Sequence, residues 1–293
     1  MPFIITTESN SEIPYQWEDR YNIKVLRMPY SVDGVEYYYD LGRETDIGAF
    51  YEKMRAGATV TTAQRNPNEI VEFWTPLLEA GLDILHIGFS SQLSGTFNCE
   101  QMAREELLER FPARTIVMID TLAISMPLGQ LVLHAAIMKE EGASIEEIAQ
   151  WVEQNKQRSC ALFTVESLEY LRRGGRISNA SAFFGTVLEI KPVLYISPEG
   201  LLVPIEKIKG RKKAVKYLLD QCAATIENPK EQTVYICQAN CMEDALALEA
   251  KVREQIAPKD VVINPVGPVI GSHCGPGTMA LVYFGASRAS LKK

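Results

Sequence analysis

The chain has 293 residues, about twice the length of a typical domain, which favours two domains or one large α/β domain. Its 46% hydrophobic and 23% charged residues exclude a disordered, collagen-like or coiled-coil protein. Apolar stretches such as residues 280–286 fall far short of the ~20 residues that span a bilayer, so no integral membrane segment is expected. The net charge of -7 argues against general nucleic-acid binding.

The remaining composition favours a protein without a cofactor or a metal. The first residues lack the basic and then apolar pattern of a signal peptide, so a cytoplasmic location is expected. Six cysteines are scattered without a CxxC motif and indicate no disulfide framework. His86, His134 and His273 lack zinc-motif spacing, and no nucleotide-binding loop is recognisable. We therefore expect no metal site and no cofactor.

The first half of the chain alternates short apolar runs with amphipathic segments, a pattern typical of βαβ units. Predicted strands cover 3–7, 24–32, 83–90 and 114–120. Predicted helices cover 15–21, 50–57, 70–81, 94–111 and 127–142, and a further helix begins after Ser144 with a capping box. This order predicts a doubly wound, mainly parallel sheet.

The second half contains more strands than helices. Predicted strands cover 161–165, 191–197, 201–208, 233–239, 261–267 and 280–286, and predicted helices cover 211–226 and 242–256. This content favours an α+β domain with a mainly antiparallel sheet. The sequence thus predicts an α/β protein with an N-terminal domain over 1–157 and a C-terminal domain over 158–293.

Two hydroxyl-rich loops of the N-terminal domain are candidates for ligand binding. Ser94, Gly95 and Thr96 lie between a predicted strand and a helix N-terminus, where backbone N–H groups can bind a phosphate or carboxylate. An ordinary helix cap explains the same residues equally well. In the loop 59–66, Thr62 and Gln64 are further donors to such a ligand, although capping of the following helix is the simpler interpretation.

Residues 267–280 form a glycine-rich segment around His273, which we expect to be a loop. Its glycines allow close approach of the backbone to a ligand, and His273 is suited to donate to an anion or relay a proton. A turn histidine bonded to backbone is the alternative. His86 and His134 lie within apolar patterns, which favours a place in the core.

A strongly basic segment belongs to the C-terminal domain. Residues 170–216 hold ten Lys or Arg against three acids, which gives +7 and leaves -14 for the rest of the chain. A solvated surface is the simplest explanation, but such a charge also steers acidic partners or phosphate. In the RRGGR sequence, paired glycines permit a tight turn that gathers the guanidinium groups of Arg172, Arg173 and Arg176.

Together these motifs resemble the DegV family of fatty-acid-binding proteins along nearly the whole chain. The matching segments are IITTESNSEIP, the TTAQ loop, SSQLSGTF, the Asp120-Thr121 pair, ESLEYLRRGGRIS, LEIKPVL, KGRKKA and VIGSHCGPGT. The chain departs from the usual family pattern at Glu8, Ala63, Arg65 and Pro127.

The resemblance implies a carrier that binds one long-chain fatty acid and presents its carboxylate to a separate ATP-dependent fatty acid kinase, for acyl phosphate formation in phospholipid metabolism. It implies that Thr62, Ser94, Gly95 and His273 bind the carboxylate. Arg173, Arg176 and Arg211 are expected to face the kinase or its phosphates. Such a carrier is not itself an enzyme, has a fatty acid as its only bound ligand, and can contact membranes transiently.

Two other functions remain open at this point. Ser94 and His273 are suited to act as nucleophile and base of a serine-dependent acyl hydrolase, but no GxSxG motif and no orienting acid is recognisable. A lipid-sensing regulatory module is the third reading. Sequence reasoning leaves the carrier and the sensor unresolved.

Overall fold

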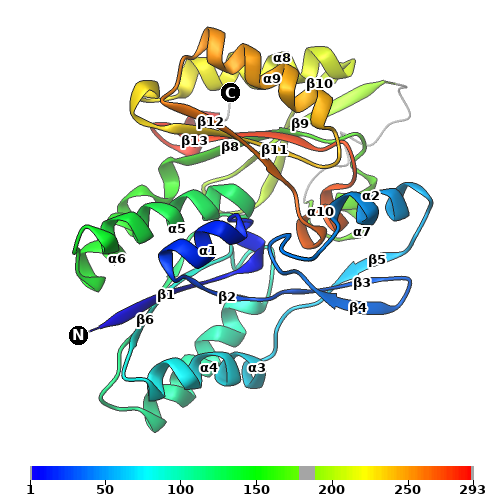
Figure 1. Cartoon of the computed structure of the whole chain (residues 1–293). Helices are drawn as coiled ribbons and strands as arrows, with labels where there is room; N and C mark the ends of the chain where they lie inside the picture. Colours follow the sequence, from blue (N-terminus) through cyan, green and yellow to red (C-terminus); the bar gives the residue numbers. More distant parts are fainter. Residues whose placement is uncertain (1, 178–188, 292–293) are drawn as a thin grey trace.

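The computed structural model describes residues 2–177 and 189–291 and contains three β-sheets (Figure 1). Ser178, the last residue of the YLRRGGRIS motif, lies outside the described residues. Sheet A has four strands, sheet B has three and sheet C has six. No helix of the described residues is long and apolar enough to cross a membrane.

Sheet A is parallel throughout and has the strand order β2-β1-β6-β7. Its strands are β1 (Phe3–Glu8), β2 (Lys24–Leu26), β6 (Asp83–Gly88) and β7 (Ile116–Asp120). Helices α3 (Pro67–Glu79) and α4 (Thr96–Arg110) pack on one face, and α5 (Ser125–Glu140) and α6 (Ile145–Asn155) pack on the other (Figure 1). The predicted doubly wound parallel sheet is therefore confirmed.

Helix α5 is packed between two sheets, because it contacts β1 and β6 of sheet A and β8 and β13 of sheet C. Its first eight residues, from Ser125 to Val132, are all buried. A helix that is apolar on every side is expected to be buried on every side. Pro127 is its third residue, within the first turn, where the missing N–H costs no helical hydrogen bond.

Sheet B corrects the prediction of one strand over 24–32. It is antiparallel, with the order β4-β3-β5, and consists of β3 (Pro29–Val32), β4 (Val35–Tyr38) and β5 (Val60–Thr62). The chain leaves sheet A after Leu26, because the N–H of Met28 bonds to the Ser9 hydroxyl at 2.9 Å instead of to a neighbouring strand. The predicted strand is thus divided between two sheets.

Sheet C has the order β10-β9-β8-β13-β11-β12 and is antiparallel except for the parallel pair β11 and β12. Its strands are β8 (Ser159–Thr164), β9 (Ile190–Ile196), β10 (Leu202–Lys209), β11 (Thr233–Gln238), β12 (Asp260–Pro265) and β13 (Met279–Phe284). Helices α8 (Arg211–Thr225) and α9 (Met242–Gln255) cover one face, and α5 covers the other. The fold is two-domain α/β, as predicted. We retain 1–157 and 158–293 as proposed limits of the domains.

The remaining helices include two α-helices that the sequence did not predict. The described residues also form α1 (Tyr15–Tyr21), α2 (Ile47–Arg55), α7 (Glu169–Arg173), α10 (Pro268–Cys274) and the short 3₁₀ helices η1 (Ser9–Ser11), η2 (Lys156–Arg158), η4 (Pro229–Glu231) and η5 (Arg288–Leu291). Helix α10 replaces the expected loop around His273, and α7 precedes the paired glycines. Helix α10 packs against α2, β3 and β5, which brings this segment of the C-terminal domain onto sheet B.

Candidate ligand site

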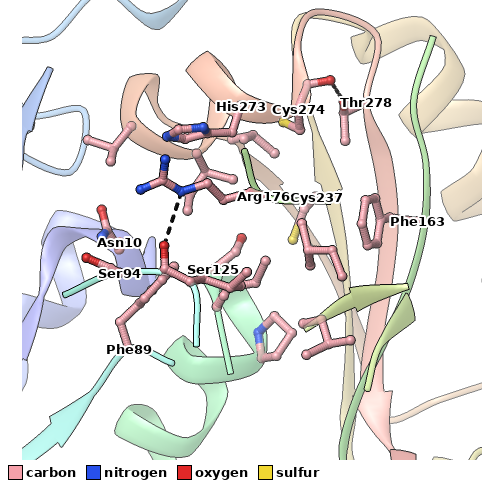
Figure 2. Close-up of a pocket in the computed structure, with 18 of the residues that line it drawn as sticks. Asn10, Phe89, Ser94, Ser125, Phe163, Arg176, Cys237, His273, Cys274 and Thr278 are labelled. Atoms are coloured by element: carbon pink, nitrogen blue, oxygen red, sulfur yellow. Dashed lines mark hydrogen bonds between the residues drawn. The ribbon is translucent and has the colours of Figure 1, made fainter. Parts of the chain in front are cut away.

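A cavity of about 150 Å³ lies between the carboxyl end of sheet A, the start of α5, the inner face of sheet C and α10 (Figure 2). Most of its wall is apolar. The apolar side chains that line it include Phe89, Leu93, Ile124, Phe163, Leu171, Ile196, Leu202, Val266, Val269, Ile270 and Val282. A largely apolar cavity with a few converging polar groups is the usual form of a small-molecule site.

The polar groups of the cavity lie at or near the ends of strands and helices. Thr62 ends β5, Gln64 and Ser94 lie in the loops after β5 and β6, and Arg176 follows α7. In Figure 2, Arg176 lies between His273 of α10 and the loop that carries Ser94. Five side chains that can form hydrogen bonds are therefore gathered at one part of an apolar cavity.

His273 is held by two neighbours. Its Nε2 lies 2.8 Å from the hydroxyl of Thr62, and its buried Nδ1 has no hydrogen-bond partner among the described residues. Gly174 allows this packing, since a Cβ there would lie 2.2 Å from Nδ1. Burial, followed by the nearby charge of Arg176, lowers the pKa of His273 to about 4. The imidazole is therefore neutral at pH 7.

Ser94 and Gly95 have different roles in the loop before α4. The Ser94 hydroxyl lines the cavity, lies 3.0 Å from the Thr96 hydroxyl and accepts the Thr96 N–H at 3.2 Å. Gly95 does not line the cavity. A Cβ on Gly95 would lie 2.3 Å from Oε1 of Gln64, so this glycine allows Gln64 to reach the cavity wall. The interpretation of these hydroxyls as an ordinary helix cap is wrong, because the N-cap residue of α4 is Gly95 and it has no side chain to cap the helix. Ligand binding by Ser94 stays a prediction.

Arg176 is the basic side chain that enters the cavity. Its Nε donates to the carbonyl of Leu93 at 3.1 Å, and its Nη1 donates to the carbonyl of Gly174 at 2.5 Å. These bonds hold the guanidinium against the loop between β6 and α4. Neither partner is a carboxylate, so the positive charge of Arg176 is not neutralised by these contacts.

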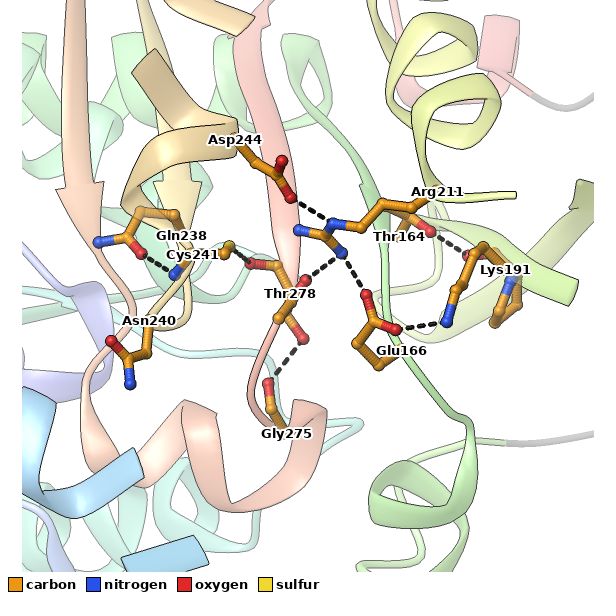
Figure 3. A network of polar contacts seen from close by, with 12 residues as sticks. Thr164, Glu166, Lys191, Arg211, Gln238, Asn240, Cys241, Asp244, Gly275 and Thr278 are labelled. Carbon is orange, nitrogen blue, oxygen red and sulfur yellow. Dashed lines mark hydrogen bonds and ion pairs between the residues drawn. The ribbon is translucent and has the colours of Figure 1, made fainter. Parts of the chain in front are cut away.

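Arg173 and Arg211 lie outside the cavity wall. The guanidinium of the exposed Arg173 lies over the ring of Tyr170, 5.1 Å from its centroid. Arg211 donates to Asp244 at 2.5 Å, to Glu166 at 2.6 Å and to the carbonyl of Gly277 at 2.6 Å (Figure 3). Part of the basic segment is thus paired with acids from outside it.

The cavity offers little for nucleophilic catalysis. Among the described residues, Ser94 has no hydrogen bond to His273, and His273 has none to a carboxylate. Cys274 also lines the cavity, but burial raises the pKa of its thiol to about 12. The pKa of the Cys237 thiol is likewise raised by burial. Neither an activated serine nor a thiolate is therefore present in this geometry.

Asn10 is a cavity residue that sequence reasoning missed. It lies in η1, directly after β1, and its buried Oδ1 has no partner among the described residues. Its position directly after a predicted strand could have identified it, because the carboxyl ends of neighbouring parallel strands meet at one edge of a sheet. The apolar lining residues could not be found this way, since they come from distant strands and helices of both domains.

Residues 2–286 match the family described as "Uncharacterised protein, DegV family". The chain belongs to the DegV family. A DegV domain-containing protein of Clostridium perfringens is 42% identical over 286 residues, which cover 98% of each chain.

Solved DegV structures agree with the whole of this fold. A fatty-acid-binding DegV family protein from Thermus thermophilus has a TM-score of 0.86 and 32% identity, covering 97% of this chain and all of that one. The fatty-acid-binding DegV of Bacillus subtilis has a TM-score of 0.83 and 28% identity, with 97% and 99% covered. Both share the two-domain arrangement described above.

Proposed function

We propose that this DegV protein binds one long-chain fatty acid, with the acyl chain in the apolar cavity and the carboxylate at Thr62, Ser94 and His273. The observation that carries the proposal is the neutral His273, held by Thr62 beside the unneutralised Arg176 at one part of an apolar cavity. The fatty-acid-binding relatives of the same fold support it. Gly95 contributes by making room for Gln64.

The two parts of the cavity have separate tasks in this proposal. Each buried CH₂ group contributes about 0.8 kcal/mol, so the apolar wall supplies much of the binding free energy. The hydroxyls, the imidazole and Arg176 orient the ligand, because a carboxylate placed elsewhere in the cavity would lose its hydrogen bonds. A fatty alcohol is therefore expected to bind, but more weakly than the acid of the same length.

We further propose that a separate ATP-dependent kinase phosphorylates the bound carboxylate. Arg176 is placed to offset the charge that develops there during phosphoryl transfer, and the exposed Arg173 is available to an acidic partner. Arg211 is already paired with Glu166 and Asp244, so its contribution is to hold the loop of Gly277 in place. In this scheme the DegV protein is a carrier in phospholipid metabolism and performs no chemistry itself.

Identification of the lipid in purified protein tests the binding proposal. The protein is denatured, and the released lipids are measured by mass spectrometry against a sample prepared from lysate without the overexpressed chain. We expect about one fatty acid per chain. Protein that neither carries a fatty acid nor takes up added oleate would contradict the proposal.

The kinase proposal needs its own measurement. Protein loaded with radiolabelled fatty acid is incubated with ATP and a fatty acid kinase, and the acyl phosphate is trapped as a hydroxamate. We expect ATP-dependent trapping that Arg176→Lys already reduces, since lysine cannot reproduce planar bidentate pairing. Normal loading without any trapping would leave the binding proposal intact and contradict the carrier role.

A further inference from the structure

A second cluster of polar side chains lies behind the cavity, in the core of sheet A. Glu8 ends β1, His86 lies in β6 and Glu100 lies in α4, and all three are fully buried. One ligand atom from each, a carboxylate oxygen or a ring nitrogen, lies within 4.8 Å of the others. Among the described residues this is the one group of its kind that could hold a metal ion.

The cluster contains two buried carboxyl groups that no Lys or Arg of the described residues neutralises. In the described part of the chain, neither Glu8 nor Glu100 forms an ion pair with Lys or Arg. Both oxygens of Glu100 lack a hydrogen-bond partner there. Glu8 accepts one N–H, from Phe89 at 3.1 Å, and has a long contact of 3.5 Å with Asn10. Two buried carboxylates with so few donors require a cation or a proton between them.

His86 is oriented as metal-binding histidines usually are. Its Nδ1 lies 3.0 Å from the Thr6 hydroxyl, because Thr6 and His86 are paired across β1 and β6. If Thr6 accepts the Nδ1 proton, the lone pair of Nε2 faces the carboxylates. Nε2 is buried and lies 3.0 Å from Oε2 of Glu100. Gly88 keeps a side chain away from it, since a Cβ there would lie 3.0 Å from Nε2.

We propose that Glu8, His86 and Glu100 bind one divalent transition-metal ion, with Zn²⁺ as the best fit. Zn²⁺ binds imidazole nitrogen and carboxylate oxygen at about 2.0–2.2 Å, so two such ligands at a tetrahedral or octahedral angle stand roughly 3 Å apart. The 3.0 Å between Nε2 of His86 and Oε2 of Glu100 meets this requirement, and a carboxylate oxygen of Glu8 lies within 4.8 Å of both ligands. Two carboxylates and a neutral imidazole balance the charge of the ion.

The role of this ion is structural. It joins β1, β6 and α4, and Glu8 connects it to Phe89 and Asn10, which line the fatty-acid cavity. Occupancy therefore fixes two strand ends at the cavity wall. Three protein ligands at a fully buried site also imply slow exchange, because an ion enters or leaves only when α4 separates locally from sheet A.

The metal content of the intact protein is the first test. Protein purified without a metal-affinity tag is analysed by plasma mass spectrometry, then unfolded in chelator and refolded with or without Zn²⁺, Mn²⁺ or Fe²⁺. We expect close to one ion per chain and a melting temperature several degrees higher with the metal than without it. Fewer than about 0.1 ion per chain, with no effect of any of the three metals on melting, overturns the proposal.

Variants assign the ion to this cluster. Glu100→Gln preserves the shape of the side chain, and His86→Ala removes the nitrogen ligand, so both are expected to lose the ion and the metal-dependent gain in melting temperature. Cys241→Ser is the matched control for adventitious binding to a partly buried thiol and should retain both. Full occupancy in Glu100→Gln and His86→Ala would place the ion elsewhere and overturn the proposal. If these variants fold poorly, Co²⁺-refolded wild type should show visible absorption bands of carboxylate and imidazole ligation, and their absence is equally decisive.

Discussion

Two polar regions of the molecule contain arginines of the same basic segment, yet their side chains are bonded differently. Arg176 at the cavity is held by two backbone carbonyls and has no acidic partner in the contacts described. Arg211 is bonded to two carboxylates and a carbonyl, and Glu166 also pairs with Lys191 (Figure 3). The guanidinium of Arg176 is therefore available to a ligand, whereas that of Arg211 is already bonded to neighbouring carboxylates.

The difference shows that a count of charges along a segment does not measure free charge. Glu166 and Asp244 lie outside residues 170–216, and the fold brings them to Arg211 and Lys191. What remains for binding is the arginine whose neighbours are neutral. The two regions should therefore respond oppositely to loss of their arginine, one in affinity and the other in stability.

Arg176→Met should have the largest effect on fatty-acid binding. It removes a charged donor at the carboxylate, which is worth about 1.5–3 kcal/mol, so affinity should fall roughly ten- to hundred-fold. Titration calorimetry with oleate measures the change, and thermal melting checks that the fold is retained. Arg173→Met, which changes an exposed arginine of the same segment, is the control and should bind normally. Unchanged affinity in Arg176→Met would remove this residue from the site.

Arg211→Met should give the opposite result. Its side chain is only 20% exposed and bridges Glu166 to Asp244, so its loss should lower the free energy of unfolding by about 1–3 kcal/mol. Fatty-acid affinity should stay within about twofold, since Arg211, Glu166 and Asp244 do not line the cavity. Urea unfolding measures the first quantity and calorimetry the second.

Lys216→Met provides the matched comparison for Arg211. Lys216 pairs with Asp220 on the surface of α8, where both side chains are well exposed, so the stability change should be within about 0.5 kcal/mol. A large loss of affinity in Arg211→Met with unchanged stability would instead show that Arg211 belongs to the ligand site.

The sequence predicted the elements of the fold well, because local patterns determine them. The apolar 83–90 segment became the buried strand β6, and the Ser144 capping box begins α6 as expected. The prediction of one strand over 24–32 was wrong, because its division between two sheets depends on the hydrogen bond from the Met28 N–H to the Ser9 hydroxyl. The prediction of a loop at α10 was wrong. Its glycines favour a loop locally, but Gly271 is needed in the helix because it packs against Tyr51.

The candidate site was predictable where a motif marked it and hidden elsewhere. Thr62, Ser94 and His273 came from hydroxyl- and glycine-rich loops, and the fold brings all three to one cavity. No motif marked Glu8 and Glu100 as neighbours, because their proximity depends on the pairing of β1 with β6 and on the packing of α4. Their roles, like those of the cavity residues, stay predictions.

Ser94→Ala should reduce affinity less than loss of Arg176. It removes one hydroxyl from the proposed carboxylate site, and about tenfold weaker binding is expected. Ser144→Ala is the matched control, since it removes the N-cap of α6 and should cost about 1 kcal/mol of stability without affecting binding. Equal oleate affinities for Ser94→Ala and wild type would exclude Ser94 from the carboxylate site.

The smallest effect expected is that of pH on binding between pH 6 and 8. Because burial and Arg176 lower the pKa of His273 to about 4, its imidazole is neutral throughout this range. Protonation would add a positive charge beside the carboxylate and strengthen binding, but only as the pH falls toward 4. Oleate affinity should therefore vary by less than about twofold from pH 6 to 8, measured by fluorescence displacement at constant ionic strength.

His273→Gln, which cannot titrate, should show the same flat profile at a lower affinity. If wild type instead loses affinity as the pH rises through 6.5 and His273→Gln does not, His273 binds the ligand as a cation. The carboxylate would then interact with two positive charges, those of His273 and Arg176. The cavity would differ from the Arg211 region by two unpaired cations instead of one.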